Sequence, residues 1–311
     1  MMGMFVFGEY CTYRCPYCFD FAKHGVRTGM DGWGACASAD VLDAVVRLVN
    51  DWPEEFISFS FSGGEPTVAP GVLEAMAKLR NTRAVKVYTN GADLRRLAQW
   101  VAGMPKHMHI RVFAALHAWR FTLSGCVDRR LLADTFAGLR MLADLGAEVA
   151  PFLLISRDQL VDPLYMSFAE AVCTHVGFDH DRLDIRPIKT MDGHYLSTAT
   201  ALVYTLRELS RCSRTPTTTF LHEGLREKGN EHADLSFVRQ HTACPLAGHQ
   251  VFIDVATVYG CLELSTPVDV HDPEGVQRML LRERAHAVHA CSAMDRCNVY
   301  QCGLIEDVQD D

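Results

Sequence analysis

The chain lacks the features that would assign it to a membrane, to export or to nucleic acid. No apolar run reaches the roughly 18 residues that a membrane-spanning helix needs, and no basic-then-apolar signal opens the chain. Lys and Arg number 30 against 38 Asp and Glu, for a formal net charge of −8, so the basic face that nucleic acid requires is not expected. We therefore predict a cytoplasmic protein that binds neither a membrane nor nucleic acid.

Cysteine, in contrast, is plentiful, with 12 in 311 residues. Because the cytosol is reducing, so many cysteines indicate metal ligands rather than disulfides. At 49% hydrophobic residues, the chain can form a sizeable core, in one large domain or in a large and a small one.

Three of the cysteines form the pattern C-x3-C-x2-C. Cys11, Cys15 and Cys18 follow a short apolar run over 4–9 that predicts a first strand, which places them on a loop. Three thiolates this close can bind one face of an iron–sulfur cube. A complete cube takes four cysteines, so one iron stays open, and an open position is typical of a metal that handles a substrate. A structural zinc site is the alternative, although such sites favour two pairs of ligands.

Strands and helices are predicted to alternate along the first 190 residues. We expect strands over 4–9, 56–62, 84–90, 108–117, 147–156 and 183–188, and helices over 39–52, 70–80, 92–102, 128–145 and 163–176. This order favours parallel strands joined by right-handed crossovers. In the second strand, Ile57, Phe59 and Phe61 alternate with serines. We expect the apolar set to face the helices and the serines to line a cavity that holds a ligand.

Polar residues at the strand ends are candidates for binding and catalysis. In barrels built from parallel strands and helices, ligands bind at the C-terminal ends of the strands. The second strand runs into Gly63-Gly-Glu-Pro66, where glycines let the main chain approach a ligand closely. The predicted lining is Ser60, Ser62, Tyr88, Asn90, Arg111, His117, Ser156 and Arg186. Of these, His117 and Arg186 are candidates for substrate binding or acid–base catalysis, with a structural hydrogen-bonding role as the alternative.

The cysteine pattern, followed by Phe19 and then by the GGEP sequence, resembles the radical S-adenosylmethionine (SAM) family. The resemblance implies a partial (β/α)6 barrel and a [4Fe-4S] cluster on Cys11, Cys15 and Cys18, whose open iron chelates SAM. It implies that an electron, from a donor such as flavodoxin or ferredoxin, cleaves SAM to methionine and a 5′-deoxyadenosyl radical that abstracts a substrate hydrogen. It also implies cofactor contacts at Tyr17, Phe19, Gly63, Gly64, Glu65, Asn90 and Ser156.

A second group of cysteines occupies the last 70 residues: Cys244, Cys261, Cys291, Cys297 and Cys302. Strands over 251–254 and 257–259 are predicted to form a hairpin that brings its flanking cysteines together. The group resembles the twitch or SPASM auxiliary-cluster domain, although Ala256 stands where that pattern has glycine. The resemblance implies one auxiliary [4Fe-4S] cluster on Cys244, Cys261 and two of the other three.

The cysteine left over is either structural or a hydrogen donor to a substrate radical, and a four-thiolate zinc site is the alternative for the whole group. Together, the two cysteine groups and the turn-rich segment between them predict a barrel over 1–195, a linker with bridging helices over 196–240 and a small cluster domain over 241–311.

The resemblance implies the reaction type more firmly than the substrate. Twitch-type enzymes act on small molecules, whereas SPASM-type enzymes mostly mature peptides. Because the first strand is predicted to begin near residue 4, we expect no leader-binding domain, and hence a small sugar- or aminocyclitol-like natural-product substrate that is epimerised or dehydrogenated. The alternatives are a peptide maturase that forms a thioether or carbon–carbon crosslink, and a non-catalytic iron–sulfur or zinc-binding module.

Overall fold

The computed structural model describes residues 1–8, 10–13, 36–122, 125–155, 163–175, 184–187, 250–260 and 266–286. The six N-terminal strands are β1 (Met2–Val6), β2 (Phe56–Ser62), β3 (Thr82–Thr89), β4 (His109–Leu116), β5 (Glu148–Ile155) and β6 (Asp184–Pro187). The helices among them are α2 (Ala39–Asn50), α3 (Val72–Met76), α4 (Leu94–Gly103), α5 (Ala118–Phe121), α6 (Arg129–Asp144) and α8 (Pro163–His175).

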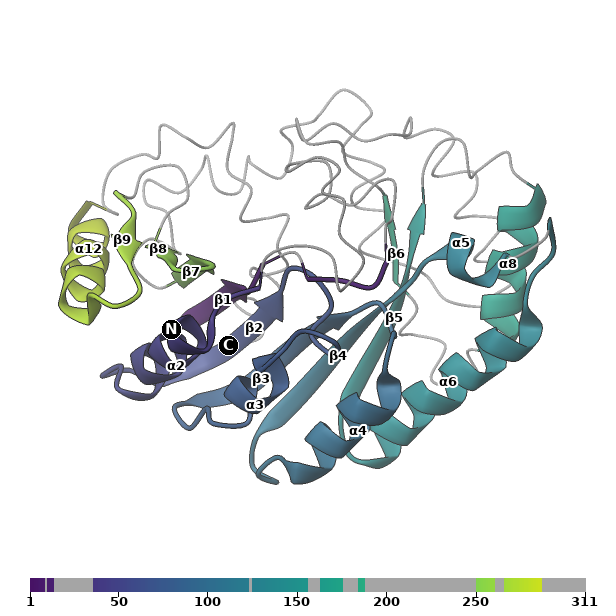
Figure 1. Cartoon of the computed structure of the whole chain (residues 1–311), viewed down its shortest axis with the longest axis horizontal. Helices are drawn as coiled ribbons and strands as arrows, with labels where there is room; N and C mark the ends of the chain where they lie inside the picture. The colour runs from purple at the N-terminus through teal and green to yellow at the C-terminus, as the bar shows by residue number, and fades with distance from the viewer. Residues whose placement is uncertain are drawn as a thin grey trace.

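Each of these strands pairs in parallel with the next one along the chain. The resulting sheet is curved, and the longer helices lie against its outer face (Figure 1). The parallel order is the one that the alternation of strands and helices predicts, and the arrangement is the partial (β/α)6 barrel that the family resemblance implies. Three elements differ most from the prediction: β1 ends at Val6 rather than at residue 9, α3 covers Val72–Met76 rather than 70–80, and the short helix α5 was not expected. Gly8, with φ of 118°, has already left the strand conformation.

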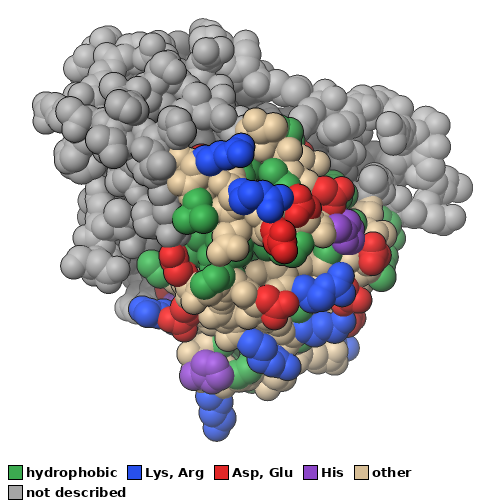
Figure 2. All heavy atoms as spheres, turned by 90° about the vertical axis from the view of Figure 1, so that its left-hand side faces the viewer, with side chains coloured by type: hydrophobic (Ala, Val, Ile, Leu, Met, Phe, Trp, Pro, Cys, Tyr) green, Lys and Arg blue, Asp and Glu red, His purple; other side chains and the backbone are tan. Residues whose placement is uncertain are grey.

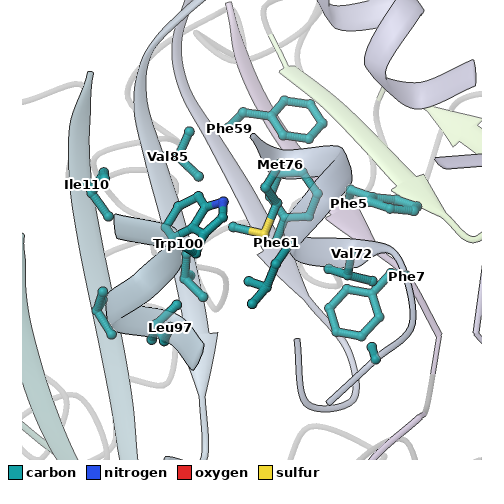
Figure 3. Close-up of a cluster of buried hydrophobic side chains, with 14 of the residues drawn as sticks. Phe5, Phe7, Phe59, Phe61, Val72, Met76, Val85, Leu97, Trp100 and Ile110 are labelled. Atoms are coloured by element: carbon teal, nitrogen blue, oxygen red, sulfur yellow. The ribbon is translucent and has the colours of Figure 1, made fainter. Parts of the chain in front are cut away.

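The main core fills the space between the sheet and the helices (Figure 3). Phe59 and Phe61 of β2 have no exposed surface and pack against each other edge to face, with ring centroids 5.4 Å apart. Met76 of α3 and Trp100 of α4 lie over this face of the sheet. Each fully buried phenylalanine stabilises the fold by roughly 1.5–3 kcal/mol. Ile57, at the start of β2, stays 40% exposed and is not part of this buried core.

Helix α2 begins at the residue that the sequence predicts. Ser38 Oγ accepts a hydrogen bond from Val41 N at 3.3 Å, and Ser38 itself keeps an extended backbone, as an N-cap should. Seven apolar side chains of the helix are buried. The helix therefore covers the β1 side of the sheet and fixes where the chain returns after the cysteine loop.

We expect the Ser38→Ala substitution to lower the free energy of unfolding by about 1 kcal/mol, because it removes the acceptor for a helix N-terminal N–H group. Urea denaturation would measure the change. Ser38→Asp is the matched control, since aspartate keeps an acceptor at this position and should retain wild-type stability. Equal stabilities for all three proteins would contradict the assigned cap.

The C-terminal strands extend the same sheet past β1. Strand β7 (Gln250–Asp254) pairs in parallel with β1 and antiparallel with β8 (Thr257–Tyr259), which pairs with β9 (Val268–Asp269) ahead of α12 (Pro273–His286). The predicted hairpin is thus confirmed. In its two-residue turn, the positive φ of 52° falls on Val255 and not on Ala256. The full order is β6-β5-β4-β3-β2-β1-β7-β8-β9.

The surface seen from the β9 and α12 side mixes charges of both signs (Figure 2). Exposed ion pairs of the protein include Lys78–Asp43 and Arg83–Glu55. Exposed pairs of this kind contribute at most about 1 kcal/mol each. Within the described ranges, none of the helices combines the length and the apolar character that crossing a bilayer would take.

Candidate functional site

The loop that carries Cys11 is held against the end of β2 by main-chain contacts. Gly64 N donates to Gly8 O at 2.7 Å, and Glu65 N donates to Tyr10 O at 2.8 Å. A Cβ atom on Gly64 would lie 2.1 Å from Tyr10 O, so no larger residue fits without moving the loop. Gly63 has φ of +118°, which also favours glycine. The sequence predicted that these two glycines let a ligand approach the main chain. In the structure it is the cysteine loop that approaches them closely.

Cys11 is the predicted cluster ligand that the structure describes. Its Sγ accepts hydrogen bonds from Tyr13 N and from Asn90 Nδ2, each at 3.3 Å. Two N–H groups directed at one sulfur stabilise negative charge there, as on a metal-bound thiolate. Cys11 therefore lies where the C-terminal ends of β2 and β3 meet, the edge at which barrels of this kind bind their ligands.

Glu65 connects the ends of β2 and β3. Its carboxylate accepts from Thr67 N at 3.1 Å, Thr67 Oγ1 at 2.6 Å, Thr89 Oγ1 at 2.7 Å and Asn90 N at 2.6 Å, and the residue has no exposed surface. Burial raises the pKa of Glu65, while the hydrogen bonds from Thr67, Asn90 and Thr89 oppose that rise. In this arrangement the predicted cofactor residue directs its side chain into the protein and orients the neighbouring strand end.

Asn90 joins three parts of the site. Its main-chain N–H donates to Glu65, its carbonyl accepts from Arg120 Nη1 at 2.9 Å, and its Nδ2 group donates to Cys11. Its Oδ1 atom is buried and finds no donor among the residues that the structure describes. A buried acceptor of this kind normally has a partner, so Oδ1 is available to a donor on a bound molecule.

Helix α5 supports the cysteine loop from the other side. The Arg120 guanidinium lies 5.4 Å from the centre of the Tyr13 ring, and the Tyr13 and Trp119 rings meet edge to face at 5.0 Å. Cation–π and aromatic contacts of these kinds are each worth about 1 kcal/mol. The short helix that follows β4 thus fixes the loop through Tyr13 and the end of β3 through Asn90.

His117, a predicted catalytic residue, lies at the end of β4 directly before α5. It is 8% exposed, and burial, with a smaller contribution from the nearby Arg120 charge, lowers its pKa to about 4. The imidazole is therefore neutral near pH 7, a state that allows it to accept a proton or a hydrogen bond. The structure supports an acceptor role for His117 rather than a cationic one.

The same pKa shift predicts a loss of stability in acid. Above pH 6.5 the histidine is neutral in both the folded and the unfolded chain, so it does not affect stability. As the pH falls toward 4, the unfolded chain binds a proton that the folded chain excludes, at a cost of about 3 kcal/mol in total. We expect His117→Gln to lose correspondingly less stability across this range in denaturation curves taken at several pH values. Parallel curves for the two proteins would contradict the shift.

A charged row crosses the inner face of the barrel below the site. The strand register aligns Ser60, Lys86, Arg111 and Glu148. Arg111 Nη2 donates to Glu148 Oε1 at 3.0 Å, and His109 Nε2 lies 3.0 Å from Glu148 Oε2. Burial would raise the pKa of Glu148, but the hydrogen bonds from His109 and Arg111 outweigh it and hold the pKa below its ordinary value. The predicted polar interior is thus present, although its residue Arg111 is paired within the protein.

Most of the predicted ligands lie outside the described residues. These are Cys15, Tyr17, Cys18, Phe19, Ser156, Cys244, Cys261, Cys291, Cys297 and Cys302, and Arg186 is described only as a member of β6, opposite Leu154. With one cysteine of the N-terminal trio described, the described part of the chain contains no group of three potential metal ligands. The predicted cluster sites and the predicted domain limits therefore stay predictions.

The sequence pointed to some of the residues that shape the site and missed others. Asn90 and the two glycines were identified from their strand-end positions, whereas Tyr13, Arg120 and Thr89 were not. Thr89 directly precedes Asn90, and Arg120 follows the fourth strand within a few residues. Their positions next to strand ends were the available signal, but their partners depend on how distant segments pack.

Comparison with known proteins identifies the fold. No protein-family model and no curated protein sequence matches the chain. SuiB from Streptococcus suis bound to its precursor peptide SuiA is similar with a TM-score of 0.53 at 13% identity, over 89% of this chain and 64% of SuiB. SuiB bound to SAM gives the same score and identity over 87% and 63%. The enzyme anSMEcpe with bound SAM and the Cp18Cys peptide gives 0.51 at 15% identity, over 95% and 87%.

Two of these structures were solved with SAM, and two were solved with a peptide. The likeness shows that the chain shares their fold, which confirms the α/β partial barrel that the resemblance implies. The chain spans less than two thirds of the length of SuiB.

Proposed function

We propose that the chain is a radical SAM enzyme that modifies a peptide by hydrogen abstraction. The observation that carries the proposal is the environment of Cys11, whose sulfur accepts two N–H groups at the open edge of a barrel shared with SAM-bound enzymes. In the proposal, Cys11, Cys15 and Cys18 hold a [4Fe-4S] cluster and leave one iron for SAM. The C-terminal cysteines hold one auxiliary cluster.

The described residues fit such a group. Cys11 is oriented by hydrogen bonds from its own loop and from β3, as expected for a metal ligand with outer-shell support. The buried Asn90 Oδ1 atom, which has no donor within the described residues, offers an acceptor beside the same sulfur. A protonated amino group, such as that of SAM, is a suitable donor for this position.

Reductive cleavage of SAM to methionine and a 5′-deoxyadenosyl radical is the chemistry that the bound cluster would supply. The residues of the chain hold and orient the reactants. Glu65, Asn90 and Arg120 fix the strand end beside Cys11. His117, neutral near pH 7 because burial lowers its pKa, is placed to accept a proton or a hydrogen bond from substrate. The main-chain hydrogen bonds of Gly64 and Glu65 keep the cluster loop at the mouth of the barrel.

A peptide is the better-supported substrate class. SuiB was solved with the precursor peptide SuiA, and anSMEcpe was solved with the Cp18Cys peptide. The small-molecule substrate expected from the sequence has no comparable support. The kind of modification depends on how the substrate radical reacts after hydrogen abstraction. Epimerisation, dehydrogenation and crosslinking are therefore alternative outcomes of the same first step.

Anaerobic reconstitution with iron and sulfide, followed by dithionite and SAM, tests the proposal. We expect about eight irons per chain for two [4Fe-4S] clusters and release of 5′-deoxyadenosine. Deuterium-labelled candidate peptides should transfer their label to 5′-deoxyadenosine, whereas sugars and aminocyclitols should not. Zinc in place of iron, with no cleavage of SAM, would overturn the enzyme assignment. Label transfer from a sugar but from no peptide would overturn the substrate class.

A further inference from the structure

We propose that Asn90 is a positioning residue that orients the Cys11 thiolate and sets the reduction potential of the N-terminal cluster. The inference rests on the proposed function, since it concerns a cluster bound through Cys11. It assigns to the Nδ2 group of Asn90 a task in addition to the cofactor contact that the Oδ1 atom makes in the proposed function. The amide group that reaches the sulfur comes from the end of β3, far along the chain from the cysteine loop.

The main chain of Asn90 is held on both sides. Its N–H group donates to Glu65 Oε2 at 2.6 Å, and its carbonyl oxygen accepts from Arg120 Nη1 at 2.9 Å. The residues beside it are also fixed: Thr89 Oγ1 donates to Glu65 at 2.7 Å and accepts from Gly91 N at 3.0 Å. Because the backbone is anchored in this way, the side chain starts from a defined position next to Cys11.

The side chain presents a donor to the sulfur. Asn90 Nδ2 lies 3.3 Å from Cys11 Sγ, and a metal-bound thiolate has no proton of its own to donate, so the NH₂ end of the amide is the end that matches it. Tyr13 N supplies a second donor from within the loop. The Tyr13 donor belongs to the main chain and survives any side-chain substitution, whereas the Asn90 donor can be removed by mutation.

A donor at this sulfur favours the reduced cluster. Reduction adds an electron whose charge spreads onto the sulfur ligands, and an N–H group stabilises that added charge. Removing the donor therefore lowers the reduction potential. A loss of about tenfold in the ratio of reduced to oxidised cluster at a fixed potential corresponds to 59 mV for one electron. Reductive cleavage of SAM depends on this potential, so the Asn90 Nδ2 group would act on the reaction through the Cys11 sulfur.

The test is a redox titration followed by electron paramagnetic resonance on the reconstituted full chain without SAM. The variants are Asn90→Ala, which removes the donor, and Asn90→Asp, which keeps the shape but places an acceptor beside the sulfur. For Asn90→Ala we expect the ratio of reduced to oxidised cluster at a fixed potential to fall about tenfold, which lowers the reduction potential by about 59 mV. For Asn90→Asp we expect a larger fall.

Asn81→Ala is the matched control. Asn81 Nδ2 donates to the carbonyl oxygens of Val49, Trp52 and Glu54 at the opposite end of β3, away from the cysteine loop. This variant should lose stability and keep the wild-type potential. If the role of Asn90 were only structural, its variants would behave like Asn81→Ala. They would lose stability and keep the wild-type reduction potential.

The outcomes separate the inference from the proposed function. An intact cluster with unchanged potential in both Asn90 variants overturns the inference and leaves the proposed function standing. Failure of the wild-type chain to bind a cluster at Cys11 overturns the proposed function first. Loss of the cluster from both Asn90 variants, with wild-type loading of Asn81→Ala, supports the positioning of Cys11 by Asn90.

Discussion

Replacing Cys11 with alanine is expected to abolish the cleavage of SAM. The substitution removes one of three proposed ligands together with the sulfur that Tyr13 N and Asn90 Nδ2 orient. Two remaining thiolates cannot hold an open cube, so about four of about eight irons should be lost. Iron analysis and the release of 5′-deoxyadenosine under dithionite measure the two effects, and the release should fall to the level of a protein-free control.

Cys36→Ala is the matched control for this experiment. Cys36 is partly buried, and its main chain pairs with that of Gly8 in an isolated antiparallel β-bridge near the cysteine loop. Burial raises the pKa of the Cys36 thiol, so it remains protonated and is a poor metal ligand. This variant should keep its iron and its activity. Full activity of Cys11→Ala, or loss of iron from Cys36→Ala alone, would show that the ligands are assigned wrongly.

The second large effect is expected from Gly64→Ala. The added methyl group would lie 2.1 Å from Tyr10 O and 2.6 Å from Tyr10 C, both main-chain atoms that cannot rotate away. The loop must therefore shift, at a cost of about 3 kcal/mol, and it carries Cys11 with it. We expect a lower free energy of unfolding in urea and little or no cluster after reconstitution.

Gly103→Ala provides the comparison, because a Cβ atom at the end of α4 meets nothing within 4 Å. Its effect on stability should stay within about 1 kcal/mol, since alanine favours a helix more than glycine does. Cluster loading should match the wild-type protein. If Gly64→Ala behaved like Gly103→Ala, the close main-chain approach at Gly64 would not be needed to position Cys11.

The local pattern of the sequence was enough to predict the alternating strands and helices, whereas the barrel itself was implied by the family resemblance. Apolar spacing located α2 and Ser38 located its start, because both depend on neighbours a few residues apart. The pairing of β7 with β1 was not predictable in this way. It joins Met2 to Gln250, and strand periodicity says nothing about which distant strand becomes the neighbour.

The same distinction applies to the site. Cys11, Gly63 and Gly64 were identified because their spacing along the chain is itself the pattern. The contact between Asn90 and Cys11 depends on the parallel packing of β1, β2 and β3, and the contact of Arg120 with Asn90 depends on the unpredicted helix α5. Glu65 shows the limit most clearly, since its position was predicted but the inward direction of its carboxylate was not.

The parallel pairing of β7 with β1 has a consequence for biosynthesis. During translation, β1 and β2 emerge well before β7, so the β1 edge that β7 covers lacks this partner until residues 250–254 have left the ribosome. Until then, the nascent sheet is open on the edge of β1 from which the cysteine loop continues. Pairing of β7 with β1 then closes that edge.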